Sequence, residues 1–97
     1  MQEREIERYL VMRIAQVGGK ALKFVSPSYS GMPDRLLLLP DGKVAFVEVK
    51  APRQTPRRLQ EHRIAMLRRM GQQVFVVDTK RAVDDLVYSL TGERTCM

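Results

Sequence analysis

Apolar side chains recur at spacings of three and four residues in three parts of this sequence. That spacing places them on one face of a helix, so it predicts three amphipathic helices. They cover residues 3–17, 56–70 and 79–90. Gly18 and Gly71 directly follow the first two, and glycine is common where a helix ends.

The second helix allows more detailed expectations. Thr55 followed by Pro56 predicts its start, with threonine as the N-cap and proline in the first helical position. The buried stripe of this helix is then expected to consist of Leu59, Met66, Leu67 and Met70, with Ile64 beside it.

Shorter apolar runs, bounded by glycine, proline and polar residues, predict four strands. These are residues 21–26, 35–39, 44–49 and 73–77. Four consecutive leucines in the second run indicate a strand that is covered on both faces, as in the middle of a sheet. The intervening Pro40-Asp41-Gly42-Lys43 has the composition of a tight turn, so the second and third strands should form a hairpin.

The resulting order is helix, three strands, helix, strand, helix, and it predicts an α/β fold. Three strands in a meander, a helical crossover and a fourth strand give a central mixed four-stranded sheet flanked by helices. The 97 residues suit a single domain, 1–97. We expect residues 91–97, which include the single cysteine Cys96, to form a loose tail.

Composition excludes several classes of protein. No apolar run approaches the roughly 20 residues that span a bilayer, and the charged start of the chain is unlike a signal peptide. One cysteine allows no intrachain disulfide, and the sequence has no Cys/His cluster of the kind that binds zinc. We therefore expect a cytoplasmic protein without a membrane partner.

The distribution of charge favours a polyanionic partner. The net charge is +6, and seven basic residues but one acid lie between Lys50 and Arg69. A basic stripe of this kind favours contacts with phosphate, although a solvated helix face gives the same pattern. Tyr29, in a loop rich in serine, either stacks on a base or sugar or anchors its own loop. The residues expected to hold backbone phosphates are Arg53, Arg57 and Arg58.

Two acids and a lysine interrupt the predicted hairpin. Asp34 precedes its first strand, and Glu48 and Lys50 lie near the end of its second. An antiparallel hairpin brings these two places together, and residues two apart on a strand share a face. Two carboxylates can bind Mg²⁺ or Mn²⁺, with the carbonyl of Val49 as a further ligand. The lysine could then orient a water or stabilise charge on a phosphate oxygen.

This arrangement predicts a metal-dependent centre for phosphodiester hydrolysis. The competing explanation is structural: an internal salt bridge between Lys50 and either acid.

The motifs resemble those of the VRR-NUC family, in the PD-(D/E)xK nuclease superfamily, and most closely its small stand-alone members from phages and bacteria. The resemblance covers about residues 3–90. It rests on Gly31-Met32-Pro33-Asp34 before a leucine-rich strand, Pro40-Asp41-Gly42 in the hairpin, Glu48-Val49-Lys50, Gln60 eleven residues before Gly71, and Glu3 three residues before Ile6.

The resemblance implies a restriction-endonuclease-like core and metal-dependent cleavage of DNA. It implies that Asp34 and Glu48 bind the metal, that Lys50 acts on water or phosphate, that Gln60 supports the site, and that Glu3, or as second choice Glu7 on the same helix face, assists a metal.

It further implies a homodimer, similar in size to Holliday-junction resolvases, that cuts branched DNA inside a bacterium or a phage-infected host cell. A dimer also suits the small size of the chain and a two-fold substrate. Two alternatives stay open: a DNA-binding module without catalysis, and a nuclease that acts on linear DNA ends or on RNA.

Overall fold

The computed structural model describes residues 1–92, and the order of its elements is the predicted one. The helices are α1 (Glu3–Gln16), α2 (Arg58–Arg69) and α3 (Lys80–Thr91). The strands are β1 (Lys20–Lys23), β2 (Arg35–Leu38), β3 (Val44–Val49) and β4 (Gln73–Val77). The predicted α/β class is therefore confirmed.

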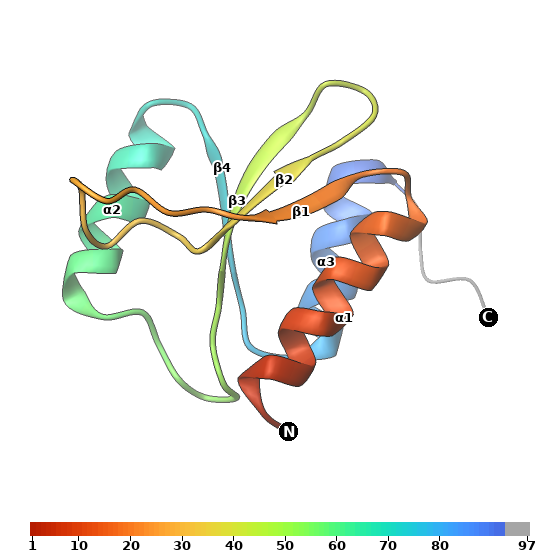
Figure 1. Cartoon of the computed structure of the whole chain (residues 1–97), viewed down its shortest axis with the longest axis horizontal. Helices are drawn as coiled ribbons and strands as arrows, with labels where there is room; N and C mark the ends of the chain where they lie inside the picture. Colours follow the sequence, from red (N-terminus) through yellow and green to blue (C-terminus); the bar gives the residue numbers. More distant parts are fainter. Residues whose placement is uncertain (93–97) are drawn as a thin grey trace.

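The four strands form one mixed sheet in the order β1-β2-β3-β4. The first three strands are antiparallel neighbours, and β4 runs parallel to β3. Two parallel strands cannot be joined by a tight turn, so α2 forms the crossover between them. Figure 1 shows α1 and α3 together on one side of the sheet and α2 on the other.

Strand alternation divides β3 between the two faces of the sheet. Val47 and Val49 belong to the larger apolar core, which lies between the sheet and the helices α1 and α3. Phe46 packs against the smaller core under α2, which contains Ile64 and Val74. Glu48 shares the parity of Phe46, so its side chain also lies on the α2 side.

The predicted start of α2 is wrong. The helix begins at Arg58, with Arg57 as its N-cap, so Thr55 and Pro56 remain in the preceding loop. The backbone N–H of Arg57 donates to Gln60 Oε1 at 3.1 Å. A glutamine three residues after the N-cap thus satisfies a backbone donor that the helix itself leaves unpaired, which fixes the later start.

The predicted buried stripe of α2 is wrong in part. Ile64 and Leu67 are buried, whereas Leu59 is 44% and Met70 70% exposed. A single helix covers this side of the sheet, and its ends extend beyond the small core. For the same reason Leu38 of β2 is partly exposed, so the four leucines are not all covered on both faces.

Other bounds also differ from the predictions. β1 ends at Lys23 rather than at residue 26. The third helix includes Thr91 and ends at Gly92, which adopts a left-handed conformation with φ 77°, so the expected tail cannot begin at residue 91. Cys96 lies outside the described residues. Within residues 1–92, none of the helices has the length and apolar character needed to cross a bilayer.

Candidate active site

The hairpin brings Asp34 and Glu48 face to face. The register of β2 and β3 pairs Arg35 with Val47, and one further position places Asp34 opposite Glu48. The backbone of Asp34 also stays in line with the sheet, because its carbonyl accepts a hydrogen bond from the N–H of Phe24 at 2.9 Å. Directly opposed residues on antiparallel strands have neighbouring side chains on one face. The two acids therefore meet as the sequence predicts.

Glu48 is almost fully buried, at 3% exposure, and its two carboxylate oxygens differ. Oε2 accepts one hydrogen bond, from Gln60 Nε2 at 2.8 Å, and pairs with Lys50 Nζ at 3.1 Å. Oε1 is buried without a hydrogen-bond partner among the described residues. Burying such an oxygen unpaired is costly, so it calls for a cation or a donor from outside the chain.

Asp34 has the same property. Its Oδ1 is buried and has no hydrogen-bond partner in the part of the chain that the structure describes. Burial is the main reason that the pKa of Asp34 rises to about 6, and the nearby charge of Glu48 raises this pKa further. The backbone N–H of Val49 acts in the opposite direction. With this pKa, Asp34 is mostly ionised at neutral pH, and the charge of Glu48 repels it.

The salt bridge expected as a structural alternative is present, but it leaves this repulsion in place. Lys50 pairs with Glu48, and one lysine offsets the charge of one carboxylate only. Asp34 and Glu48 together with Lys50 therefore carry a net negative charge in a largely buried setting.

Gln60 connects the site to the start of α2. Its Oε1 accepts the N–H of Arg57, and its Nε2 donates to Glu48 Oε2. The same side chain therefore caps the helix and fixes the rotamer of the buried carboxylate. Because Gln60 and Lys50 both occupy Oε2, the remaining oxygen Oε1 is left free to bind a cation.

The residues present fit a hard divalent cation. Asp34 Oδ1 and Glu48 Oε1 are two buried, unpaired carboxylate oxygens on adjacent strands, and such oxygens are the preferred ligands of Mg²⁺ and Mn²⁺. Across residues 1–92, however, no three His, Cys, Asp or Glu side chains gather closely enough to bind one ion. An ion at this site would therefore keep several water ligands.

The acids of α1 do not join this pair. Glu7 accepts two hydrogen bonds from Arg35, at 3.1 Å from Nε and 2.9 Å from Nη2. Arg35 follows Asp34 in the strand, so its side chain leaves on the opposite face. The charge of Glu7 still raises the pKa of Asp34, whereas Glu3 is exposed at the helix start. Glu7, the second choice from the sequence, is thus the acid of α1 whose charge acts on Asp34.

The predicted phosphate-binding arginines lie on the chain that leaves the site. Arg53, Arg57 and Arg58 are all exposed, in the loop after β3 and at the start of α2. In Figure 1 this loop and the start of α1 lie at the same end of the molecule. An arginine-rich helix N-terminus adds its own partial positive charge to theirs, which favours an anion.

Tyr29 anchors its loop to α2. Arg63 lies over the Tyr29 ring, with its guanidinium carbon 3.7 Å from the centroid, and Arg63 Nη1 donates to the Tyr29 hydroxyl at 3.0 Å. Arg63 Nε also donates to the carbonyl of Ser30 at 2.7 Å. Of the two roles open from sequence, these contacts support the loop anchor. They also leave Arg63 less available to phosphate than the exposed Arg53, Arg57 and Arg58.

Two residues that the sequence patterns did not single out lie at this end of the sheet. Arg35 holds Glu7, as described above, and Asp78 accepts the backbone N–H of Arg53 through Oδ2 at 3.2 Å. Asp78 directly follows β4, and polar residues at the carboxyl end of a parallel strand are a recognisable signal.

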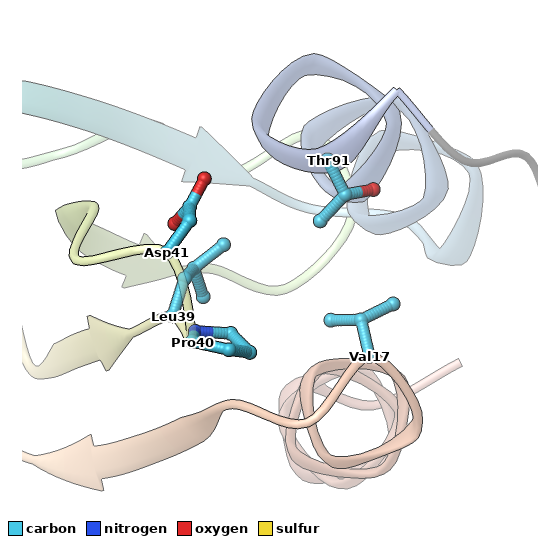
Figure 2. A pocket seen from close by; sticks show the side chains of 5 residues that line it. All are labelled: Val17, Leu39, Pro40, Asp41 and Thr91. Carbon is cyan, nitrogen blue, oxygen red and sulfur yellow. The ribbon is translucent and has the colours of Figure 1, made fainter.

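A separate hollow of about 190 Å³ lies at the other end of the hairpin. Figure 2 shows its lining, which comes from the end of α1, the β2–β3 turn and the end of α3. Its one acid, Asp41, is exposed and pairs with Lys43 at 3.5 Å. The hollow lacks the buried, unpaired carboxylates of the site at Asp34, so we do not assign the chemistry to it. Its lining residues are Val17, Leu39, Pro40, Asp41 and Thr91.

Comparison with known proteins agrees with this geometry. Residues 3–81 match the model of the VRR-NUC domain family. A protein named "Putative nuclease p44", from Acyrthosiphon pisum secondary endosymbiont phage 1, is 49% identical over 82 residues, which cover 82% of this chain and 86% of the relative. A solved structure described as a VRR_NUC domain superposes with a TM-score of 0.84 at 32% identity, covering 90% of this chain and 96% of its own. The chain belongs to the VRR-NUC domain family.

Proposed function

We propose that this protein is a Mg²⁺- or Mn²⁺-dependent endonuclease that hydrolyses DNA phosphodiester bonds. The observation that carries the proposal is the pair of buried, unpaired oxygens, Asp34 Oδ1 and Glu48 Oε1, beside Lys50. Membership of the VRR-NUC family and the name of the phage relative both support nuclease chemistry.

Asp34 and Glu48 would hold the ion. A bound divalent ion would polarise a phosphate and lower the pKa of its water ligands. The carbonyl of Val49, between Glu48 and Lys50, is proposed as a further ligand. Gln60 keeps Glu48 in the orientation that leaves Oε1 free. The acid of α1 proposed to assist through water is Glu7, with Glu3 as the alternative.

Lys50 serves a different role from the carboxylates. Its ammonium group is partly buried and pairs with Glu48 at 3.1 Å, which holds it at the edge of the site. An ammonium group has three donors and no acceptor. One donor can remain on Glu48 while the others bind a phosphate oxygen or an attacking water. A fixed positive charge there would stabilise the charge that develops on phosphate during hydrolysis.

The substrate is proposed to be DNA held by its backbone. Arg53, Arg57 and Arg58 are exposed and lie just beyond Lys50 in the chain. Arginine binds phosphate through planar, paired donors, and each such contact releases a counterion. Binding should therefore weaken steeply with salt and depend little on base sequence.

Branched DNA and a homodimer belong to the same proposal. The likeness to small stand-alone nucleases supports both, and a two-fold protein suits paired cuts across a two-fold junction. A DNA-binding module without catalysis is the second candidate. The unpaired oxygens argue against it, because phosphate binding alone gives no reason to bury two ionised acids together.

The decisive experiment uses a labelled four-way junction, the matched linear duplex and an RNA duplex of the same sequence. Each is incubated with Mg²⁺, with Mn²⁺ or with a chelator. We expect cleavage with either metal and none with the chelator. Asp34→Ala should abolish cleavage, while Asp85→Ala, which removes an exposed acid from α3, should cleave like the wild type. Lack of cleavage by the wild type under every metal would disprove the nuclease proposal.

The choice of substrate and the assembly need separate readouts. Faster cleavage of the junction than of the duplex supports the branched substrate, whereas equal rates on both DNAs would contradict it. Faster cleavage of RNA would make RNA, and not DNA, the proposed substrate. Sedimentation at micromolar concentration should give twice the mass of one chain. A monomer under these conditions would contradict the dimer while leaving the catalytic proposal intact.

A further inference from the structure

Arg53 has an unusual backbone. Its φ is 66°, and within residues 1–92 no other residue apart from glycine has a positive φ. The left-handed conformation is unfavourable for a residue with a Cβ atom, so it persists only where the surrounding structure enforces it. Arg53 lies three residues beyond Lys50, in the loop from β3 to α2. Such residues are often found at functional sites.

Asp78 supplies the enforcing contact. Its Oδ2 accepts the backbone N–H of Arg53 at 3.2 Å. Next to it in the loop, the N–H of Gln54 donates to the carbonyl of Ala51 at 2.9 Å, which closes a turn around Arg53. The strained residue is therefore held from within the loop and from β4.

Sheet pairing brings Asp78 to this position. β3 and β4 are paired up to Val49 and Val77, and the N–H of Lys50 extends the ladder to the carbonyl of Val77 at 2.9 Å. One further position places Asp78 beside Lys50, at the carboxyl end of the two parallel strands. The loop that leaves the site thus has an acid of the neighbouring strand directly beside it.

Other roles for Asp78 are less consistent with its contacts. It does not complete a group of three metal-binding side chains within the described residues. It is not needed to cap α3, because Thr79 Oγ1 accepts the N–H of Ala82 at 3.0 Å. Its side chain instead accepts the backbone N–H of Arg53.

We propose that Asp78 is a positioning residue that fixes the backbone of Arg53, so that the Arg53 guanidinium is pre-oriented toward a DNA phosphate next to Lys50. This inference rests on the proposed function. The Arg53 side chain is exposed and has no ion pair within the described residues, so its charge is available to a ligand. Fixing the backbone from which a flexible side chain extends lowers the conformational entropy that is lost on binding.

Four variants distinguish the positioning of Arg53 by Asp78 from a general effect of losing an exposed charge. Asp78→Ala removes the acceptor, whereas Asp78→Asn removes the charge but keeps an acceptor oxygen. Arg53→Gly keeps the left-handed backbone accessible and removes the guanidinium. The fourth is the double variant Asp78→Ala/Arg53→Gly. Asp85→Ala and Lys20→Ala serve as matched controls for the loss of an exposed charge elsewhere.

Affinity for the labelled junction is measured with a chelator present, so that no cleavage occurs. Asp78→Ala and Arg53→Gly should each raise the Kd by about threefold to tenfold, the range expected for one lost contact. The direction of the change in Kd for Asp78→Ala is informative, because removing an acid near DNA would by itself tighten binding. Asp78→Asn should change the Kd by less than about twofold, since its amide oxygen still accepts the N–H.

The double variant gives the critical result. It should bind no more weakly than Arg53→Gly alone, because the group that Asp78 positions is already absent. In cleavage assays with Mg²⁺, Asp78→Ala should raise KM and leave kcat nearly unchanged. Either control variant weakening the Kd as much as Asp78→Ala would overturn the inference.

Three further outcomes would also overturn it: unchanged affinity of Asp78→Ala, equal loss in Asp78→Asn, or additive losses in the double variant. Amide hydrogen exchange of Arg53 provides a readout without DNA. It should be protected in the wild type and in Asp78→Asn and fast in Asp78→Ala; equal exchange in all three would contradict the contact. A wild type that does not bind DNA would disprove the proposed function, and this inference with it.

Discussion

The two faces of the sheet both bury charged side chains, but they treat them differently. On the α1 and α3 side, Arg13 is 5% exposed and its Nε pairs with Asp84 Oδ1 at 2.9 Å, where the Tyr9 hydroxyl also donates at 2.7 Å. On the α2 side, Asp34 and Glu48 each keep a buried oxygen without a partner in the described chain. The first arrangement satisfies its own groups, whereas the second requires something from outside.

This difference follows from how completely each face is covered. Two helices seal the first face over a continuous apolar core, while one helix covers the second and leaves polar groups near the surface. Strand β3 contributes to both faces, with Val47 and Val49 on one and Glu48 on the other. Alternate residues of the same strand therefore contribute to the stability of the fold and to the proposed chemistry. The same substitution, Asp to Asn, made on each face should affect stability on one face and cleavage on the other.

The largest effect is expected from Asp34→Asn. It keeps the size of the side chain but removes a proposed ligand, so cleavage with Mg²⁺ should fall on the order of a thousandfold. The metal-free protein should be as stable as the wild type or more stable, because a carboxylate in a repulsive setting has been neutralised. Cleavage rates and thermal unfolding measure the two quantities. Loss of stability together with retained cleavage would contradict the assignment of the catalytic site to the α2 side of the sheet.

Asp84→Asn makes the same chemical change on the other face. It removes the charge that pairs with buried Arg13, and it should lower the free energy of unfolding by about 2 kcal/mol, less than for a fully buried pair because Asp84 is partly exposed. Cleavage by the folded protein should remain near that of the wild type. Denaturant unfolding and cleavage at low temperature test this pair of outcomes. A catalytic loss comparable to that of Asp34→Asn would mean that the two faces are not separable.

Gln60→Ala should have an intermediate effect on chemistry. Its loss removes a hydrogen bond to Glu48, which then keeps only the ion pair with Lys50, and it also removes a helix cap. Removing a residue that orients a metal ligand typically weakens metal binding by about 10- to 100-fold, and we expect the lower end here because Lys50 still holds Oε2. Calorimetric titration with Mn²⁺ measures the affinity. Glu61→Ala, at the next and exposed position, should bind Mn²⁺ like the wild type.

The response of metal affinity to pH should be the smallest of these effects. Asp34 has a pKa of about 6, above its ordinary value of 3.8, so a proton competes with the metal below pH 6. Affinity for Mn²⁺ should then fall by about threefold as the pH decreases from about 6.5 to about 5.5, as expected for one ligand that must lose a proton. Titration over this range in wild type and Asp34→Asn tests it; an affinity of the wild type independent of pH would exclude Asp34 as a ligand.

A decrease in pH should affect the stability of the metal-free protein in the opposite direction from its effect on metal affinity. Because the folded state binds the proton of Asp34 more tightly than the unfolded state, this group favours folding of the metal-free protein below about pH 4. That contribution is lost as the pH rises through about 6. Asp34→Asn should remove this part of the pH dependence, as seen in unfolding curves, and Asp84→Asn should not remove it.

The local parts of this protein could be predicted from its amino-acid sequence. Helical and strand periodicity predicted the order of the elements. The turn at Pro40 to Lys43 predicted the hairpin, and the hairpin brought Asp34 to Glu48. These features depend on residues close in sequence, since a tight turn fixes the register of the strands on either side of it. The family motifs from Gly31 to Lys50 lie in the same stretch, whereas Gln60 and Glu3 lie outside it.

The surroundings of that hairpin depend on tertiary packing. The hydrogen bond from Gln60 to Glu48, the pairing of Glu7 with Arg35, and the support of Arg53 by Asp78 join residues from different elements. Each depends on how two elements pack, and the periodicity of either element alone carries no information about its partner. The sequence thus placed the two carboxylates together. The packing of α2 and β4 around them determined which oxygens are left unpaired and how the arginine loop is held.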